Sequence, residues 1–384
     1  MKVLFISHSA SRSGAVLLLL SLLRWLKANT DISCEVLLAG KGPLCADFAA
    51  LAPLYTPVTQ PARAGVVKCL LQPLGSAAGK LAGLLPLRKN GRGGDYDLVY
   101  ANTVMLGDVL EVVAPPGCPV VTHVHELDRW ISHAGEQNFE RVKRHTDRYV
   151  AASGAVRDNL VAHHGIPVDR VEVVHSFIPT RGISANPEGI RERLGIPDDS
   201  LVVLGSGHES WCKGKDLFVL LASHLRDLAP GRPPHFLWVG GWQHAEERRN
   251  ILHDVEHLGL SGQVHFSGEV ANPLDYFAAG DLFALVSRED SFPLAGLEAA
   301  ALGKPVLCFA NAGGMPEFVQ EDAGFVVPYL DLPAMARKIA VLYEDPLLRR
   351  RLGESAANRA RGRHDVAAGA ERIYRIIREF DKGP

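Results

Sequence analysis

Two carboxylates, Asp290 and Glu298, stand eight positions apart in the stretch "SREDSFPLAGLEAAALGKPVLCF", residues 287–309. A strand-like run precedes them, and Pro293 is typical of the first turn of a helix that would run to Gly303. Free backbone N–H groups at a helix start bind anions, most often phosphate. Because carboxylates accept hydrogen bonds from sugar hydroxyls, the combination suits a ligand with phosphate and hydroxyl groups, such as a nucleotide sugar.

A simpler explanation exists for either carboxylate alone, since Asp290 could cap the helix and Glu298 could be solvated on its surface. Other polar residues also follow predicted strands. His125 and Glu126 lie in "HVHELDRW" after the strand-like "PVVT", and Asn102 lies in "YANTV". A lone histidine is more often structural, and turn chemistry alone explains an asparagine. The repetition of polar residues at strand ends nevertheless favours a ligand site, because parallel sheets bind ligands there.

The elements that must position these residues form two series of short apolar runs separated by helix-length segments. Strands alternating with helices predict parallel sheets, and two series of similar length predict two doubly wound α/β domains. Pro, Gly, Ser and Asn cluster at residues 176–189, which favours a boundary there. The expected domains are 1–180 and 181–365. Residues 366–384 are expected to form a helix that packs back on the N-terminal domain.

Composition agrees with a globular protein of this size. The 384 residues are 47% hydrophobic and 22% charged, and the formal net charge of −2 gives no general argument for nucleic-acid binding. Six cysteines are scattered without C-x-x-C spacing, which favours a reducing compartment and a cytoplasmic location. The run "AVLLLLSLLRWL", residues 15–26, is too short to span a bilayer and is expected to be a buried first helix.

The stretch from 264 to 319 resembles the E-x(7)-E region of retaining glycosyltransferases of the GT-B fold, specifically the glycogen-synthase-like group called glycosyltransferase family 4. The resemblance extends over nearly the whole chain. It implies two Rossmann-like domains facing across a cleft, the first for the acceptor and the second for a nucleotide sugar. One residue departs from the pattern: the first glutamate falls on Asp290, and Glu289 just before it is a candidate substitute.

Carried over to this sequence, the resemblance implies that Asp290 or Glu289 lies near the hydroxyls of the donor sugar and that Glu298 binds the nucleotide ribose. Backbone N–H groups would bind the sugar and phosphates. Those expected to offer them belong to Ser291, Phe292 and Leu294.

The segment "GSGHESWCKGKDLF", residues 205–218, is similar to the family segment in which an arginine and a lysine grip the diphosphate. Lys213 matches the lysine, whereas His208 occupies the arginine position and need not be charged at neutral pH. A leaving diphosphate needs cationic partners, so Lys213 is the stronger donor-binding candidate. The alternative is a lysine that is merely solvated in a polar loop.

In the first half, the resemblance places a catalytic histidine at a strand end facing the donor sugar, and His125 matches it better than His123. A glycine in the loop "SHSASRSGAV" would approach the donor phosphate, which implies Gly14. The expected acceptor-side residues are Arg12, Asn102 and Glu126.

The implied function is retaining transfer of a hexose-type sugar from a UDP- or GDP-linked donor to a saccharide or lipid-linked saccharide in cell-envelope glycan synthesis. The departing phosphate oxygen would take the acceptor proton, so neither a dedicated base nor a metal or other cofactor is expected. Alternatives are a GT-B nucleotide-sugar epimerase and a catalytically silent nucleotide-sugar-binding subunit. A phosphorylase is disfavoured, because its chain is longer and carries a pyridoxal-phosphate lysine.

Residues 61–94 contain six basic residues and no acidic one, interleaved with Val, Leu and Ala. Such a stretch could form amphipathic helices that lie on an anionic membrane, where each basic group contributes about 1 kcal/mol. A peripheral position at the inner face of a membrane is therefore one hypothesis. The alternative is an insertion whose apolar residues pack on the first sheet while its charges stay solvated.

Overall fold

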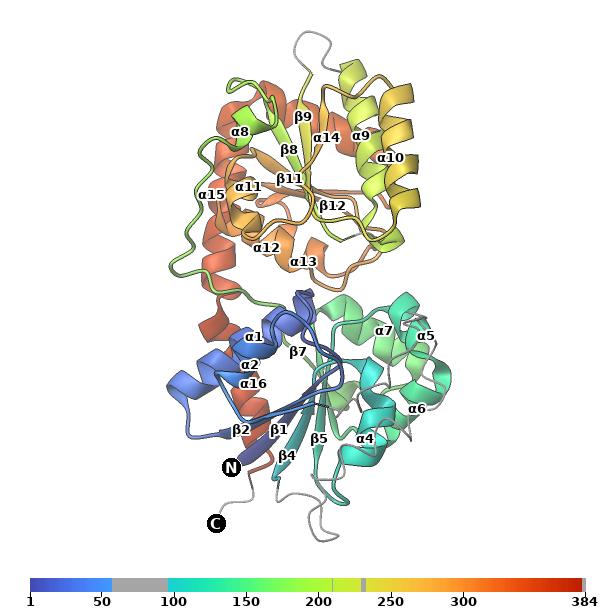
Figure 1. Ribbon diagram of the computed structural model, residues 1–384, viewed down its shortest axis with the longest axis vertical. Helices are drawn as coiled ribbons and strands as arrows, with labels where there is room; N and C mark the ends of the chain where they lie inside the picture. Colours follow the sequence, from blue (N-terminus) through green and yellow to red (C-terminus); the bar gives the residue numbers. More distant parts are fainter. Residues whose placement is uncertain (57–95, 209, 229–232, 382–384) are drawn as a thin grey trace, which may run out of the picture. The chain divides into compact units, whose positions relative to one another are not determined.

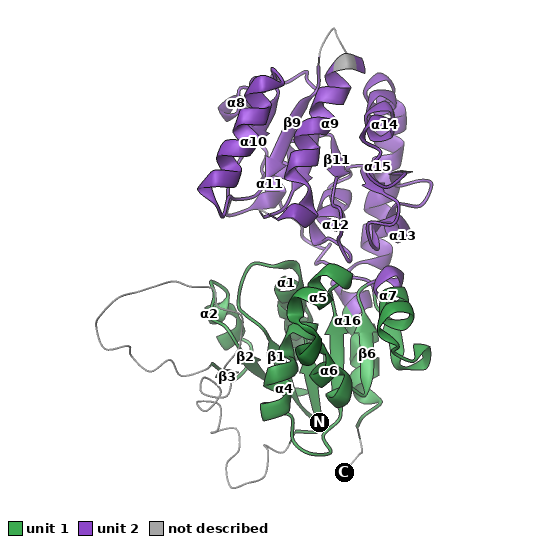
Figure 2. Cartoon of the chain, turned by 90° about the vertical axis from the view of Figure 1, so that its right-hand side faces the viewer, with its two compact units in different colours: residues 1–152, 157–174, 370–384 green, residues 153–156, 175–369 purple. Residues whose placement is uncertain are grey.

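The computed structural model describes residues 1–56, 96–208, 210–228 and 233–381. The chain forms two compact units (Figure 2): unit 1 comprises residues 1–152, 157–174 and 370–384, and unit 2 comprises residues 153–156 and 175–369. The main passage from unit 1 to unit 2 therefore falls at residues 174 and 175, slightly before the expected boundary. Residues 61–94, on which the membrane hypothesis depends, lie outside the described residues.

Unit 1 contains a seven-stranded sheet in the order β3-β2-β1-β4-β5-β6-β7, in which every pair is parallel. Its central strands are buried on both faces, as expected for a sheet covered by helices on both sides. The strands are β1 (Lys2–Ser7), β2 (Ser33–Leu38), β3 (Leu54–Tyr55), β4 (Leu98–Ala101), β5 (Val120–Val124), β6 (Arg148–Ala151) and β7 (Val171–Val173).

Helices cover both faces of this sheet (Figure 1). One face carries α1 (Gly14–Asn29), α2 (Cys45–Ala49) and the later part of α16 (Val366–Arg378), and the other carries α4 (Gly107–Val113), α5 (Asp128–Ala134), α6 (Glu136–His145) and α7 (Gly154–His164). The prediction of a buried first helix is confirmed, because seven residues of α1 are buried. Among the described residues, no helix combines the length and apolarity needed to cross a membrane.

Unit 2 contains a six-stranded parallel sheet in the order β10-β9-β8-β11-β12-β13. Every strand that the apolar runs predicted is present in the two units, whereas the two-residue β3 was not predicted. The strands of unit 2 are β8 (Val202–Ser206), β9 (His235–Val239), β10 (Val264–Phe266), β11 (Leu282–Leu285), β12 (Val306–Phe309) and β13 (Gly324–Val327).

Successive side chains of these strands enter two separate hydrophobic cores, because side chains alternate between the faces of a sheet. Val203 belongs to one core, and its neighbours Val202 and Leu204 belong to the other. The first core is closed by α9 (Lys215–Leu228), α10 (Ala245–His257) and α14 (Leu332–Glu344), and the second by α11 (Pro273–Ala278), α12 (Leu294–Ala301), α13 (Met315–Val319) and α15 (Pro346–Arg363). The short α8 (Ile190–Arg193) precedes β8.

Candidate functional site

Each sheet reverses its strand order at one point, between β1 and β4 in unit 1 and between β8 and β11 in unit 2. Open parallel sheets bind ligands at the carboxyl ends of the strands beside such a reversal, because the connections there leave in opposite directions. The loops that follow β8 and β11 carry Lys213 and Asp290, and the loops that follow β4 and β5 carry Asn102 and His125. The predicted residues therefore lie where this topology places a ligand.

Lys213 and Asp290, which are 77 positions apart, form an ion pair in unit 2. The Nζ atom of Lys213 donates to Oδ2 of Asp290 at 2.5 Å, and the hydroxyl of Ser287 donates to the same oxygen at 3.3 Å. The side chain of Asp290 is only 10% exposed. Its backbone N–H donates to the carbonyl of Ala312 at 2.8 Å, which fixes the loop after β11 against the loop after β12. The ion pair thus places the ammonium group of Lys213 beside the position where the diphosphate is expected.

The helix after this loop begins one residue later than predicted. Pro293 is the extended N-cap residue, with φ −67° and ψ 126°, and the first helical residue is Leu294. No described residue accepts a hydrogen bond from the backbone N–H groups of Ser291, Phe292 or Leu294. A hydrogen bond fixes this loop to the loop after β12, because the backbone N–H of Gly314 donates to the carbonyl of Ser291 at 3.0 Å. These N–H groups are thus available to an anionic ligand.

Glu298 lies one turn into α12 and is partly buried. Burial raises its pKa to about 7, so the carboxyl group is half protonated near neutral pH. None of the residues that the structure describes hydrogen-bonds to this carboxyl group. Because Glu298 is only partly buried, a ligand could still reach it. Glu289, which was the alternative to Asp290 as the first carboxylate, is also partly buried. The ion pair with Lys213 is formed by Asp290.

His208 follows β8 and lies close enough to Lys213 and Asp290 to interact electrostatically with both. Burial, together with the positive charge of Lys213, lowers the pKa of His208 below its ordinary value, so the imidazole is neutral at pH 7. Sequence reasoning missed Lys215, which is 2% exposed, donates to the carbonyl of Gly241 at 3.0 Å and lies 3.6 Å from the ring centroid of Trp242. Lys213, whose side chain is 23% exposed, is therefore more accessible than Lys215, which is the first residue of α9.

In unit 1, His125 and Asn102 lie together at the ends of β5 and β4. Nε2 of His125 lies 3.2 Å from Oδ1 of Asn102, and the amide nitrogen of Asn102 donates to the carbonyl of Ala15 at 2.9 Å. Because the amide oxygen can only accept, Nε2 carries the proton and Nδ1 is left as an acceptor. Burial, and to a lesser degree the charge of His8, lowers the pKa of His125 to about 3, so it stays neutral.

His123 is enclosed within β5, where it is 0% exposed and its Nδ1 lies 2.8 Å from the hydroxyl of Tyr100. It therefore cannot reach a ligand, in contrast to the partly exposed His125. Glu126 accepts hydrogen bonds from the hydroxyl of Thr103 and from the backbone N–H of His125, the latter at 2.9 Å. Burial raises the pKa of Glu126 to about 7 despite these bonds. These contacts indicate that Glu126 braces the loop that presents His125.

Gly14 is exposed and is the first residue of α1, and Arg12 is exposed in the loop before it. Sequence reasoning missed His8, which directly follows β1. It is partly buried, and burial lowers its pKa below the ordinary value. Its position at a strand end is the signal that could have identified it.

Glu317 in α13 is a third residue whose role the sequence did not predict. Its carboxylate accepts hydrogen bonds from the backbone N–H groups of Gly154 and Ala155, each at 3.0 Å, and lies 2.7 Å from Nε2 of His175. Burial acts to raise the pKa of Glu317, but these hydrogen bonds outweigh it and lower the pKa below the ordinary value. The carboxylate thus satisfies free donors at the start of α7.

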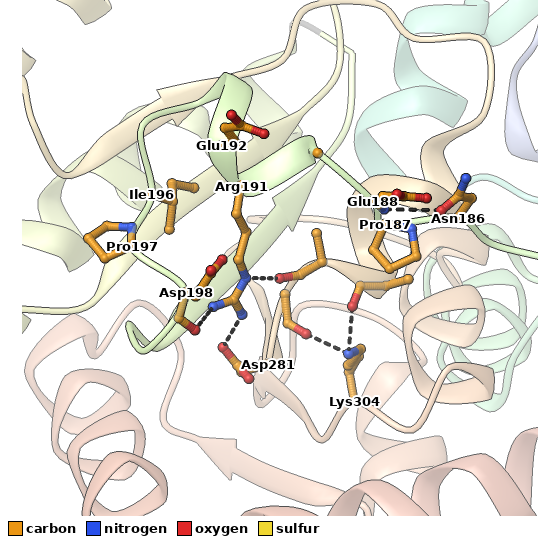
Figure 3. A pocket seen from close by; sticks show the side chains of 14 residues that line it. Asn186, Pro187, Glu188, Arg191, Glu192, Ile196, Pro197, Asp198, Asp281 and Lys304 are labelled. Atoms are coloured by element: carbon orange, nitrogen blue, oxygen red, sulfur yellow. Dashed lines mark hydrogen bonds and ion pairs between the residues drawn. The ribbon is translucent and has the colours of Figure 1, made fainter.

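A cavity of about 810 Å³ lies at the opposite edge of the unit 2 sheet (Figure 3). Its two cations are already engaged: Arg191 binds Asp281 at 3.0 Å and three backbone carbonyls, and Lys304 binds the carbonyls of Ala278 and Gly280. Asp281 and Lys304 precede β11 and β12, so this is the amino edge of the sheet. The cavity is a structural junction remote from the candidate site.

Comparison with known proteins gives matches over both halves of the chain. The model of Glycosyltransferase Family 4 matches residues 13–181, and that of Glycosyl transferases group 1 matches residues 187–359. The D-inositol 3-phosphate glycosyltransferase of Streptomyces bingchenggensis is 30% identical over 321 residues, which cover 75% of this chain and 70% of that protein. The D-inositol 3-phosphate glycosyltransferase 1 of Catenulispora acidiphila is 29% identical, with 76% and 74% covered.

Solved structures show the same fold. Anabaena HepE in complex with UDP and glucose has a TM-score of 0.80 at 22% identity, with 99% of this chain and 100% of that chain covered. WaaG, a glycosyltransferase involved in lipopolysaccharide biosynthesis, has a TM-score of 0.75 at 17% identity, with 99% and 100% covered. The prediction of two Rossmann-like parallel-sheet domains, as in the GT-B fold, is confirmed. Together with the two family models, the 30% identical relative shows that the chain belongs to the group 1 glycosyltransferases of the family 4 type.

Proposed function

We propose that this glycosyltransferase moves a hexose-type sugar from a UDP- or GDP-linked donor to a saccharide or lipid-linked saccharide, with retention of the anomeric configuration. The observation that carries the proposal is the Lys213–Asp290 pair beside the start of α12, at the carboxyl edge of the unit 2 sheet. The complexes of Anabaena HepE with UDP and with UDP-glucose support a uridine donor.

In the proposed reaction, the donor diphosphate binds the N–H groups of residues 291–294 and the ammonium group of Lys213. Asp290 then exchanges part of its contact with Lys213 for a hydroxyl of the donor sugar. Lys213 stabilises the charge that develops on the diphosphate as the bond to the anomeric carbon breaks. The acceptor oxygen bonds to the same face of that carbon, and its proton passes to the departing phosphate oxygen.

His125 would serve as a neutral acceptor. With Nε2 directed to Asn102, Nδ1 can accept a hydrogen bond from a sugar hydroxyl and orient it, without adding a positive charge. No described group in unit 1 needs to act as the base, because the leaving phosphate takes the proton.

The first experiment measures whether the full chain binds UDP or GDP by calorimetry and whether it releases the nucleoside diphosphate from UDP-glucose or GDP-mannose. We expect binding of one nucleotide without added divalent metal, together with slow hydrolysis of its sugar conjugate. A catalytically silent subunit would bind the nucleotide but would release nothing, and an epimerase would change the sugar without releasing it. Either result would exclude the transferase reaction proposed here.

A second prediction concerns pH. The pKa of Glu298 is about 7, so its carboxyl group is mostly neutral at pH 6 and mostly ionised at pH 8. An ionised carboxylate is the stronger acceptor for a ribose hydroxyl, and the difference is worth roughly 1 kcal/mol. UDP affinity should therefore rise about fivefold between pH 6 and pH 8 in the wild type. In Glu298→Gln it should be lower and nearly flat. Parallel calorimetric curves for both proteins would exclude this role.

Two classes of acceptor, an inositol phosphate and a neutral saccharide, are compatible with the proposed reaction. The D-inositol 3-phosphate glycosyltransferases that this chain resembles act, by their names, on an inositol phosphate, so this compound belongs in any acceptor panel beside neutral saccharides. A role in cell-envelope synthesis at the inner face of a membrane remains a hypothesis based on the charges of residues 61–94. Sedimentation with anionic vesicles would test it, since binding should weaken with salt.

A further inference from the structure

Two large aromatic side chains are exposed near the candidate donor site of unit 2. Trp211, in the loop after β8, exposes 55% of its surface, and Tyr329, just after β13, exposes 45%. Both belong to the carboxyl edge of the sheet, where ligands bind. Each Å² of apolar surface that stays in water instead of being buried loses about 25 cal/mol of hydrophobic stabilisation. Aromatic groups exposed beside a functional edge therefore suggest a binding surface.

The orientation of Trp211 is fixed by Arg288. The guanidinium carbon of Arg288 lies 4.8 Å from the centroid of the indole ring, and Nη1 donates to the carbonyl of Trp211 at 2.9 Å. Arg288 is held in turn by two hydrogen bonds to Asp216, at 2.9 and 2.6 Å. The hydroxyl of Tyr329 donates to the carbonyl of Arg288 at 3.2 Å. We call Trp211, Arg288 and Tyr329 the aromatic platform.

Two of the three platform residues come from the same loops as the Lys213–Asp290 pair, and Tyr329 comes from the loop after β13. Trp211 precedes Lys213 by two residues, and Arg288 precedes Asp290 by two residues. Two residues of extended chain span at most about 7 Å. A ligand group on the platform would therefore lie close to the sugar and diphosphate that the ion pair is proposed to hold.

The chemistry of the platform favours an uncharged sugar ring. The face of an indole ring carries partial negative charge, which attracts the weakly positive C–H groups on one face of a pyranose. Hydroxyls at the edge of that pyranose would find the partly exposed carboxylate of Asp216 and the phenol oxygen of Tyr329. Asp216 neutralises Arg288, and the side chain of Arg288 is only 11% exposed. A phosphate or an anionic lipid would thus find no unneutralised cation among these groups.

The acceptor must bring its hydroxyl to the donor sugar, so part of it must lie beside the residues that hold that sugar. We propose that the aromatic platform binds a second sugar ring of a saccharide acceptor, next to the ring that carries the attacking hydroxyl. The enzyme would then prefer acceptors of two or more sugar units. This inference rests on the proposed function, because it takes Lys213 and Asp290 to mark the donor position.

The test uses the full chain with methyl glucoside, maltose, maltotriose, cellobiose and cellotriose as probes, at saturating UDP. Binding is followed by calorimetry and by the change in tryptophan fluorescence. The wild type should bind at least one di- or trisaccharide about tenfold more tightly than methyl glucoside. Trp211→Ala should abolish this gain, whereas Trp211→Phe should keep most of it. Leu347→Ala, at a side chain that is 80% exposed, is the control and should behave as the wild type.

Other results would overturn the platform assignment. If Trp211→Ala binds the longer saccharides as the wild type does, or if the wild type binds none of them, the platform is not a sugar subsite. If the variant loses affinity for UDP, the ring contacts the nucleotide. If it loses binding to lipid vesicles, the platform is a membrane contact. In each case UDP-glucose hydrolysis by the wild type would leave the proposed function intact, whereas its absence together with absent nucleotide binding would overturn both.

Discussion

Replacing Lys213 with methionine should lower the turnover number about a hundredfold to a thousandfold. Removing one preorganised group that stabilises developing negative charge typically costs this much. Donor affinity should also fall, because the same ammonium group is proposed to bind the diphosphate in the ground state. The measurement is nucleoside diphosphate release from the sugar nucleotide under saturating conditions. Lys338→Met is the matched control, since Lys338 is an exposed lysine of unit 2 that contacts Phe325.

Loss of fold must be separated from loss of chemistry in this variant. Lys213→Met leaves the 10% exposed carboxylate of Asp290 without its cation, which destabilises the folded state. The double variant Lys213→Met, Asp290→Asn removes both charges and should recover much of the thermal stability. It should nevertheless stay inactive. If the double variant regained turnover as well as stability, Lys213 would be a structural residue only.

Replacing His125 with alanine should lower turnover by about a hundredfold or more, while UDP affinity stays within about twofold of the wild type. The expected split follows from its place in unit 1, on the side proposed to orient the reacting sugars, whereas Lys213 and Glu298 belong to unit 2. Positioning and proton-handling groups contribute effects of this size. His163→Ala, at an exposed histidine of unit 1, is the control.

A pH profile adds a readout that a merely structural histidine would not give. The pKa of His125 is about 3, so its charge does not change between pH 5 and pH 8. Any rise in turnover near pH 7 should therefore persist in His125→Ala, because it belongs to carboxyl groups such as Glu126 or Glu298. A loss of that inflection in His125→Ala would show that the imidazole itself titrates and is not the neutral acceptor described here.

Much of the fold followed from the sequence because its strands are short apolar runs with helix-length segments between them. The pattern failed for β3, where two residues, Leu54 and Tyr55, carry no periodicity. It also placed Pro293 inside the helix rather than just before it. Proline fixes only φ, and the N-cap and first helical positions both accept that value.

The site was harder to predict because its contacts join distant parts of the chain. The residues of the Lys213–Asp290 pair could each be named from a motif, but their separation of 2.5 Å follows from the neighbouring positions of β8 and β11. No local pattern indicates that Glu317 caps the start of α7. Likewise, no local pattern indicates that the guanidinium group of Arg288 lies over the indole ring of Trp211.

The return of residues 370–384 to unit 1 has a consequence for biosynthesis. Ile373, Ile376 and Ile377 are buried, Tyr374 packs on Trp25 with ring centroids 6.2 Å apart, and Arg372 donates to the carbonyl of Val173 at 2.7 Å. Unit 1 leaves the ribosome first, but the face of its sheet that α16 covers (Figure 1) stays open until residues 370–378 have been synthesised. Until then the nascent chain exposes an apolar face, although every earlier part of unit 1 has already been synthesised.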